Sequence, residues 1–322
     1  MGSSNGTALL FERDAVAEVD RWDEGLPRLG RSSVLWIDLE RPGATEIERL
    51  GRELELDAET LRELAEGQRG PRLDDHAAYV HVTAIAPTPD RELARVSCLV
   101  SDRWVVTIRD RPLDALETFR ERATGSGQTG KLDGLEFLAN LLEWVLESYF
   151  DAFEQIDVEL EEVDTAAMAG EVEKRHEILA RLVGIRREIG TLRRALTSHR
   201  EAILALSRPE LEAIASSRSA ERFGRLRDRL EEAAQAARDS RESVVGSFDV
   251  LIASTGQRTN EIVKVLTLVS VLILPGTLIA GVMGMNFRVG LFDHAALFWG
   301  VLVVMSLAAV VTLAVARVRD WI

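Results

Sequence analysis

The chain has 322 residues, of which 46% are hydrophobic and 29% are charged, and its formal net charge at pH 7 is −14. The lone Cys98 excludes a disulfide scaffold and a four-cysteine zinc site, and the acidic balance argues against a nucleic-acid partner. The charge is unevenly divided, because residues 1–257 carry −16 and residues 258–322 carry +2.

Residues 1–130 are predicted to form a small α+β cytoplasmic domain, because short β-branched runs alternate there with segments of helical periodicity. Thr45 and Asp57 are the N-cap residues expected within the helical segment at 43–67. Residues 123–130 (ATGSGQTG) are typical of a connector. The predicted elements are a strand at 33–39, a helical segment at 43–67, a strand at 77–86, and a hairpin of 94–101 with 103–110.

Residues 131–257 are predicted to be long cytoplasmic helices. Apolar residues at three- and four-residue steps predict one helix at 134–168 and another at 171–207. A third helix is expected to run from about residue 210 to 285, because no proline interrupts it before Pro275. A helix of that length needs partner helices, which other copies of the chain would supply.

Residues 258–322 are predicted to be a transmembrane pore domain with spans at about 262–285 and 295–316. Each holds an apolar run long enough to cross a bilayer, and the short segment between the spans forces an antiparallel hairpin. Basic residues outside the hairpin outnumber the single Arg288 between the spans, so both termini are expected in the cytoplasm and the protein in the cytoplasmic (inner) membrane. Those outer basic residues are Arg258, Lys264, Arg317 and Arg319.

A stripe of mostly small or polar residues follows the first predicted span. Steps of three and four place its members on one face of a helix. Hydroxyl and amide groups on such a face suit a water-filled lumen, or the stripe is a helix-packing seam with hydroxyls bonded to their own backbone. The stripe consists of Asn260, Val263, Thr267, Ser270, Leu274, Thr277, Gly281 and Gly284.

The first span ends at Gly284-Met285-Asn286. Its last carbonyls and the Asn286 amide oxygen are neutral oxygen acceptors, the hard ligand type that suits Mg²⁺. Because Mg²⁺ gives up water reluctantly, a ring of such oxygens would bind the hydrated ion. The alternative is that Asn286 only caps the helix.

Residues 260–287 (NEIVKVLTLVSVLILPGTLIAGVMGMNF) closely resemble the first transmembrane segment of the CorA magnesium-channel family, including its Gly-Met-Asn motif. The segments VLWIDLERPGATEIERL and PRLDDHAAYVHV resemble its cytoplasmic domain, so the resemblance covers nearly the whole chain. It implies a funnel-shaped homopentameric channel in the lipid bilayer whose first spans line the pore and carry Mg²⁺, and often Co²⁺ or Ni²⁺, inward.

The resemblance also implies roles for individual residues. Asn286 matches the selectivity asparagine, and Gly284 with Met285 completes the filter motif. The positions that match the family's pore lining and gate are Asn260, Leu266, Leu274 and Thr277. Two departures are Met283, where magnesium members often have Tyr, and the basic Arg288 just beyond the filter.

Family members sense cytoplasmic Mg²⁺ through carboxylates between subunits, which implies that Mg²⁺ is both the transported and the regulatory ion, with no tightly bound cofactor. We expect intracellular Mg²⁺ to hold the ring of subunits in its closed state. The candidate regulatory carboxylates are Asp74, Asp75, Asp228 and Glu231.

Two alternatives stay open. The first is the zinc-transporting branch of the same superfamily. His294 is the histidine of the segment between the spans, and His76 with His81, near Asp74 and Asp75, forms the other suggestive cluster. The second is a membrane-anchored coiled-coil sensor without transport. An enzyme is not expected, since no phosphate loop or nucleophile–base set is present in the sequence.

Overall fold

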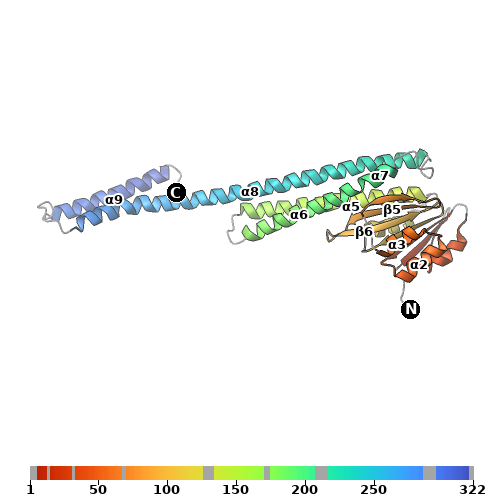
Figure 1. Ribbon diagram of the computed structural model, residues 1–322. Coiled ribbons are helices and arrows are strands. Elements are labelled where there is room, and N and C mark those ends of the chain that lie inside the picture. Colours follow the sequence, from red (N-terminus) through yellow and green to blue (C-terminus); the bar gives the residue numbers. More distant parts are fainter. Residues whose placement is uncertain are drawn as a thin grey trace. The chain divides into compact units, whose positions relative to one another are not determined.

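The computed structural model describes residues 6–12, 15–30, 33–66, 70–125, 134–169, 175–206, 217–285 and 295–318 (Figure 1). The chain divides into two compact units, Met1–Val163 with His176–Ser247 and Asp164–Arg175 with Phe248–Ile322. The predicted division at residues 130 and 257 into three domains stays a prediction.

The first unit contains a seven-stranded mixed sheet in the order β2-β1-β3-β7-β6-β5-β4. Only the β3–β7 pair is parallel, and every other neighbouring pair is antiparallel. The predicted strands and hairpin are confirmed as β3, β5, β6 and β7, whereas β1, β2 and β4 were not predicted. The strands are β1 (Gly6–Glu12), β2 (Ala15–Val19), β3 (Val34–Glu40), β4 (Arg72–Asp75), β5 (Val80–Pro87), β6 (Leu93–Val100) and β7 (Trp104–Arg109).

The helices confirm most of the helical predictions and correct two. The segment predicted as one helix at 171–207 is divided into α6 and α7, which meet at His199. The N-cap of α2 is Gly43 rather than Thr45, whereas Asp57 directly precedes α3. The helices are α1 (Trp22–Gly25), η1 (Leu26–Arg28), α2 (Ala44–Glu53), α3 (Ala58–Glu66), α4 (Asp114–Gly125), α5 (Gly134–Met168), α6 (Arg175–Ser198), α7 (Arg200–Leu206), α8 (Ser217–Met283) and α9 (Ala295–Val318).

The sheet has apolar layers on both faces because side chains alternate along each strand. Leu35 and Ile37 of β3 pack in a buried cluster with Leu50 of α2 and Leu64 of α3. The intervening Trp36 points to the other face, where its ring lies near the rings of Phe119 in α4 and Phe137 in α5. Figure 1 accordingly shows α2 and α3 on one face of the sheet and α5 on the other.

The break between α6 and α7 joins these helices to the sheet. β4 pairs with β5 only from Val80 to Thr83, so among the described residues the backbone of Ile85 has no strand neighbour on that side. The Ile85 N–H donates to Nε2 of His199 at 3.0 Å, and the Ile85 carbonyl accepts from the Tyr149 hydroxyl at 2.9 Å. The backbone groups of Ile85 are therefore satisfied by side chains from the helices.

The first part of α8 packs in the first unit along a seven-residue repeat. The seam has steps of three and four, as in a coiled coil. Its buried residues are Phe223, Leu226, Leu230, Ala233, Ala237, Ser240, Val244 and Ser247. The apolar half of α8 follows in the same unbroken helix, as predicted, despite Pro275.

Candidate functional site

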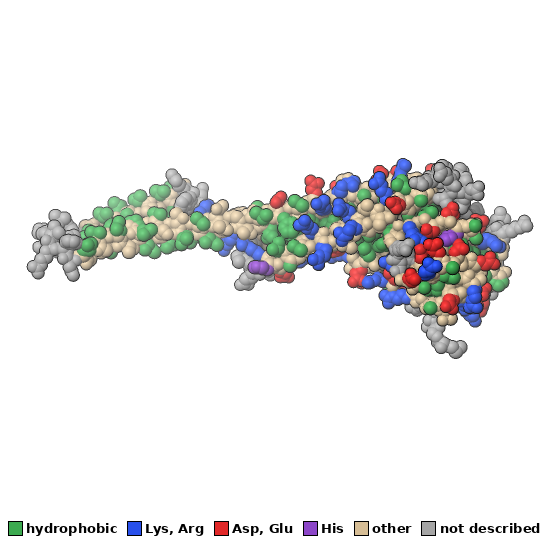
Figure 2. All heavy atoms as spheres, in the orientation of Figure 1, with side chains coloured by type: hydrophobic (Ala, Val, Ile, Leu, Met, Phe, Trp, Pro, Cys, Tyr) green, Lys and Arg blue, Asp and Glu red, His purple; other side chains and the backbone are tan. Residues whose placement is uncertain are grey.

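The second unit presents an apolar surface. The end of α8 and residues Trp299–Val318 of α9 are long and apolar enough to cross a membrane, and only 0% and 6% of their most apolar windows are buried. Figure 2 shows hydrophobic side chains over both segments. A core helix of a soluble protein would be mostly buried, so this surface is suited to lipid or to further copies of the chain.

One face of the α8 span packs against α9. Gly276 is part of that face, because a Cβ added there would lie 3.2 Å from Cε of Met305. Seven positions of the span are half-buried, and two of them, Thr267 and Ser270, belong to the polar stripe. The other five form the face toward α9: Leu268, Leu272, Gly276, Ile279 and Met283. The matching face of α9 consists of Val301, Met305, Ala309, Thr312 and Ala316.

The predicted stripe lies on the opposite side of α8. At 100° per residue, its centre is about 180° from the centre of the face that packs on α9. Leu266 and Leu274 are 64% and 66% exposed, and a Cβ added at Gly281 would meet nothing within 4 Å. The stripe is therefore not a packing seam within the hairpin, and it is available to a lumen or to another subunit.

The hydroxyls of the stripe donate to their own backbone. The Thr267, Ser270 and Thr277 hydroxyls donate to the carbonyls four residues earlier at 2.7, 2.8 and 2.8 Å. A hydroxyl that uses its proton in this way keeps oxygen lone pairs as acceptors. These acceptors lie on the side away from α9, where they suit a cation or the water molecules around one.

The helix ends where the sequence predicts. Met283 is its last residue, and the N–H groups of Gly284 and Met285 donate to Ala280 and Val282 carbonyls at 2.9 and 3.3 Å. Asn286, the predicted selectivity residue, lies outside the described residues, as do Arg288 and Asp293. At the other end of the span, Arg258 is paired with Glu261 at 2.8 Å.

A second candidate site is an acidic groove of about 890 Å³ in the first unit, between α4, α5, α8 and the end of β5. Burial and the nearby Glu147 and Glu154 raise the pKa of Asp151. Arg229 offsets part of the negative charge by pairing with Glu147 at 2.5 Å and with Glu232 at 2.9 Å. The acidic lining residues are Asp114, Glu143, Glu147, Asp151, Asp228 and Glu232.

The structure separates the four predicted regulatory carboxylates into two pairs. Asp228 lines the acidic groove, and Glu231 is exposed on α8 without lining it. Asp74 and Asp75 lie on β4, where Asp74 is paired with Nε of Arg72 at 2.5 Å. No described contact joins the β4 pair to the α8 pair.

Sequence reasoning missed most of the groove. Its acids Glu143, Glu147 and Asp151 recur every four residues on α5, a spacing that places them on one helix face. That spacing was readable in the sequence. The sequence did not show which face of α8 would oppose these acids, because that face depends on the packing of two helices whose contacting residues lie 82 positions apart.

Comparison with known proteins gives a consistent result. The chain matches the model of the CorA-like Mg²⁺ transporter protein family over residues 31–317. The cobalt/magnesium transport protein CorA of Thermotoga maritima is 26% identical over 311 residues, which are 92% of this chain and 86% of that protein. The magnesium transport protein CorA of Yersinia pseudotuberculosis is 28% identical over 274 residues, 80% of this chain and 82% of that protein.

The fold agrees with a solved structure of similar length. The CorA magnesium transporter from Methanocaldococcus jannaschii superposes with a TM-score of 0.79 at 19% identity, and the match covers 100% of both chains. The mixed sheet, the long helix and the two apolar helices of this chain therefore form a known arrangement.

Proposed function

Since the chain belongs to the CorA-like Mg²⁺ transporter family, we propose that it forms a channel that carries Mg²⁺ into the cell, with Co²⁺ and Ni²⁺ as further substrates. Its relatives are named as cobalt/magnesium and magnesium transport proteins. The family consists of transporters and not of enzymes, so this chain is not an enzyme. It sits in the cytoplasmic membrane with both termini on the cytoplasmic side, in keeping with the basic residues that flank the spans.

The polar stripe of α8 supports this proposal most directly. A chain with two spans cannot enclose a water-filled path, but a ring of chains can, and five copies would turn five stripes toward one axis. The backbone-bonded hydroxyls of Thr267, Ser270 and Thr277 then present oxygen lone pairs to the lumen. Because Mg²⁺ dehydrates reluctantly, these oxygens accept hydrogen bonds from its bound water.

The selectivity filter is proposed at Gly284, Met285 and Asn286, where α8 ends. The negative end of the helix dipole favours a cation there. Five Asn286 amides would add a ring of neutral oxygens. The apolar Leu266 and Leu274, exposed on the same side of α8, are proposed to narrow the closed pore.

Regulation by intracellular Mg²⁺ is proposed at acidic surfaces of the cytoplasmic region, with closure when the ion neutralises carboxylates that otherwise repel each other. Asp228 is the best supported of the four candidates, because it lines a groove with five other acids. Asp75 and Glu231 are exposed and available. Asp74 is already neutralised by Arg72, which makes it a weaker candidate for this role.

The alternative of zinc transport is less well supported. Zn²⁺ prefers nitrogen and sulfur ligands, and residues 260–285 contain neither His nor Cys. A sensor that does not transport ions leaves the stripe opposite α9 without a role, and the family is one of transporters.

Liposomes containing the purified chain and a Mg²⁺-sensitive dye test the proposal. Thr277→Val removes one lumen oxygen per subunit at nearly constant volume. We expect it to lower Mg²⁺ influx at least about fivefold, the factor that corresponds to about 1 kcal/mol of lost solvation. Asn286→Ala should lower influx further, because it removes the filter ring.

Thr312→Val is the matched control. The Thr312 hydroxyl also donates to the carbonyl four residues earlier, at 2.8 Å, but it lies on the face of α9 toward α8. This variant should conduct as the original protein does. Equal loss in both threonine variants, or no Mg²⁺ flux in the unmodified protein while Zn²⁺ passes, would overturn the proposal.

A further inference from the structure

A buried histidine in the first unit lacks the hydrogen bonds that its position demands. His81 of β5 has a fully buried side chain, and neither ring nitrogen has a hydrogen-bond partner among the described residues. A buried polar group without a partner costs about 1–3 kcal/mol. Such a group calls for an explanation, and an unseen ligand is one.

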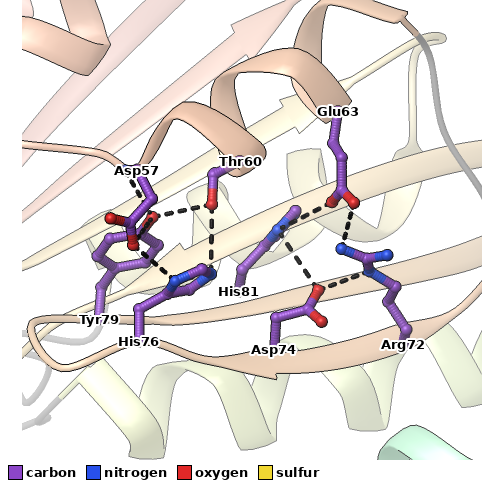
Figure 3. Close-up of polar contacts among 8 residues, drawn as sticks. All are labelled: Asp57, Thr60, Glu63, Arg72, Asp74, His76, Tyr79 and His81. Carbon is purple, nitrogen blue, oxygen red and sulfur yellow. Dashed lines mark hydrogen bonds and ion pairs between the residues drawn. The ribbon is translucent and has the colours of Figure 1, made fainter.

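Two carboxylates face this histidine from different elements. Asp74 of β4 is the direct cross-strand neighbour of His81, and Glu63 lies above both on α3. Nδ1 of His81 is 3.9 Å from Oε2 of Glu63 and 4.0 Å from Oδ2 of Asp74. Figure 3 shows the two carboxylates converging on the His81 ring. These separations are too long for hydrogen bonds.

The same separations are close to those in a metal coordination shell. With metal–ligand bonds of about 2.1 Å, two ligands of a tetrahedral ion lie about 3.4 Å apart. Shifts of about half an ångström would therefore bring either carboxylate oxygen to that separation from Nδ1, and one ligand atom from each of the three residues already lies within 4.8 Å of the other two. Oε2 of Glu63 is also buried without a hydrogen-bond partner in the described part of the chain, and Oδ2 of Asp74 is buried with only an ion pair to Nε of Arg72.

The charges of the cluster suit a divalent ion that accepts nitrogen. Burial lowers the pKa of His81 to about 4, partly offset by Asp74, so the ring is neutral at physiological pH, which is the form that ligates metals. Arg72 holds the carboxylates together, since Nε pairs with Asp74 and Nη2 with the other Glu63 oxygen. Two carboxylates and one guanidinium leave a net charge of −1.

We propose that Glu63, Asp74 and His81 form a cytoplasmic site for a transition-metal cation of the Zn²⁺, Co²⁺ or Ni²⁺ class, separate from the ion pathway. The imidazole excludes Mg²⁺, which prefers oxygen ligands. The incoming ion displaces Nε of the half-exposed Arg72 from Asp74, while Nη2 stays on Glu63 and orients that carboxylate. The bound ion links helix α3 to strands β4 and β5.

The neighbouring His76 provides a matched control. It lies on the same sheet edge, but its Nδ1 is 2.7 Å from the Asp57 carboxylate and its Nε2 is 3.3 Å from the Thr60 hydroxyl. Its ring also stacks on the ring of Tyr79, with the ring centroids 4.5 Å apart. With both nitrogens engaged, His76 has no ring atom to offer to a metal.

The test uses the full chain in detergent after removal of metals by a chelator. Co²⁺ serves as the spectroscopic probe and Zn²⁺ as the competitor, and unfolding temperatures are measured with Zn²⁺ or Mg²⁺. We expect one Co²⁺ per chain with visible bands of nitrogen–oxygen ligation, displaced by Zn²⁺. Zn²⁺ should raise the unfolding temperature by an increment that is lost when His81 is replaced, whereas any rise caused by Mg²⁺ at the acidic groove should not depend on His81.

His81→Gln should weaken this binding at least about a hundredfold, whereas His76→Gln should leave it unchanged. If His81→Gln does not fold, Asp74→Asn, at a more exposed position, carries the test. Equal Co²⁺ binding, or an equal Zn²⁺-induced rise in the unfolding temperature, in the unmodified protein and in the ligand variants would overturn the proposal. Because the readout is binding and stability, it is independent of transport.

Discussion

His199 gives the sharpest stability prediction, because it satisfies a backbone group of the sheet from the junction of α6 and α7. Its Nε2 accepts from the Ile85 N–H at 3.0 Å, its Nδ1 donates to the Ala195 carbonyl at 2.8 Å, and it is 1% exposed. His199→Leu leaves the Ile85 N–H unpaired, at about 1–3 kcal/mol, and removes an edge-to-face contact with Tyr149 worth about 1 kcal/mol.

The expected loss is about 3 kcal/mol at pH 7.5, or about 6–12 °C in the unfolding temperature for a unit of this size. The loss of unfolding free energy caused by His199→Leu should become smaller at acidic pH. Burial lowers the pKa of His199 to about 4, whereas an exposed histidine has a pKa of about 6.5. Between these values the unfolded chain binds the proton and the folded chain does not, so the original protein loses stability as the pH falls from 6.5 towards 4.

Because each pKa unit corresponds to 1.36 kcal/mol, the original protein loses about 2 kcal/mol of His199-linked stability between pH 7.5 and pH 5. The leucine variant has no such loss. The gap between the two proteins should therefore narrow to about 1 kcal/mol at pH 5.

Unfolding of the full chain in detergent, followed by circular dichroism with chelator present, measures both gaps. His176→Leu, at an exposed position of α6, should change stability by less than about 0.5 kcal/mol at either pH. A gap of the same size at pH 7.5 and pH 5 would refute the assignment of a neutral, hydrogen-bonded His199.

Two further predictions concern transport. Gly281→Leu adds a side chain on the stripe, where nothing lies within 4 Å, so the hairpin should stay intact while Mg²⁺ influx falls at least about tenfold. Gly276→Leu places its Cβ 3.2 Å from Cε of Met305, so it should instead destabilise the hairpin by about 1–3 kcal/mol. If both variants lose flux only in proportion to lost protein, the stripe does not face the ion path. Asp228→Asn should raise the cytoplasmic Mg²⁺ concentration that inhibits flux at least about threefold, as measured in the same liposomes. If flux through the unmodified protein stays constant between micromolar and millimolar Mg²⁺, Mg²⁺ does not gate the channel.

The sequence by itself determined the long helices and the two apolar spans, because hydrophobic periodicity is a local property. The two apolar runs, the uninterrupted helix through Pro275 and the helix at 134–168 were all predicted and lie where expected. The family followed from a contiguous motif. The short edge strand β4 and the split at His199 were missed, because each depends on a distant partner rather than on its own residues.

Tertiary structure decided which polar residues lie together and which faces they share. From the sequence, the stripe of α8 was equally consistent with a lumen and with a packing seam, and only the position of α9 on the opposite face excluded a seam within the hairpin. Likewise, the sequence made Asp74 a candidate regulatory carboxylate, but strand register puts it opposite His81 and the packing of α3 adds Glu63. Residue type and spacing define which groups are available, whereas burial and cross-element distances, which only the folded chain has, define which of them can act together.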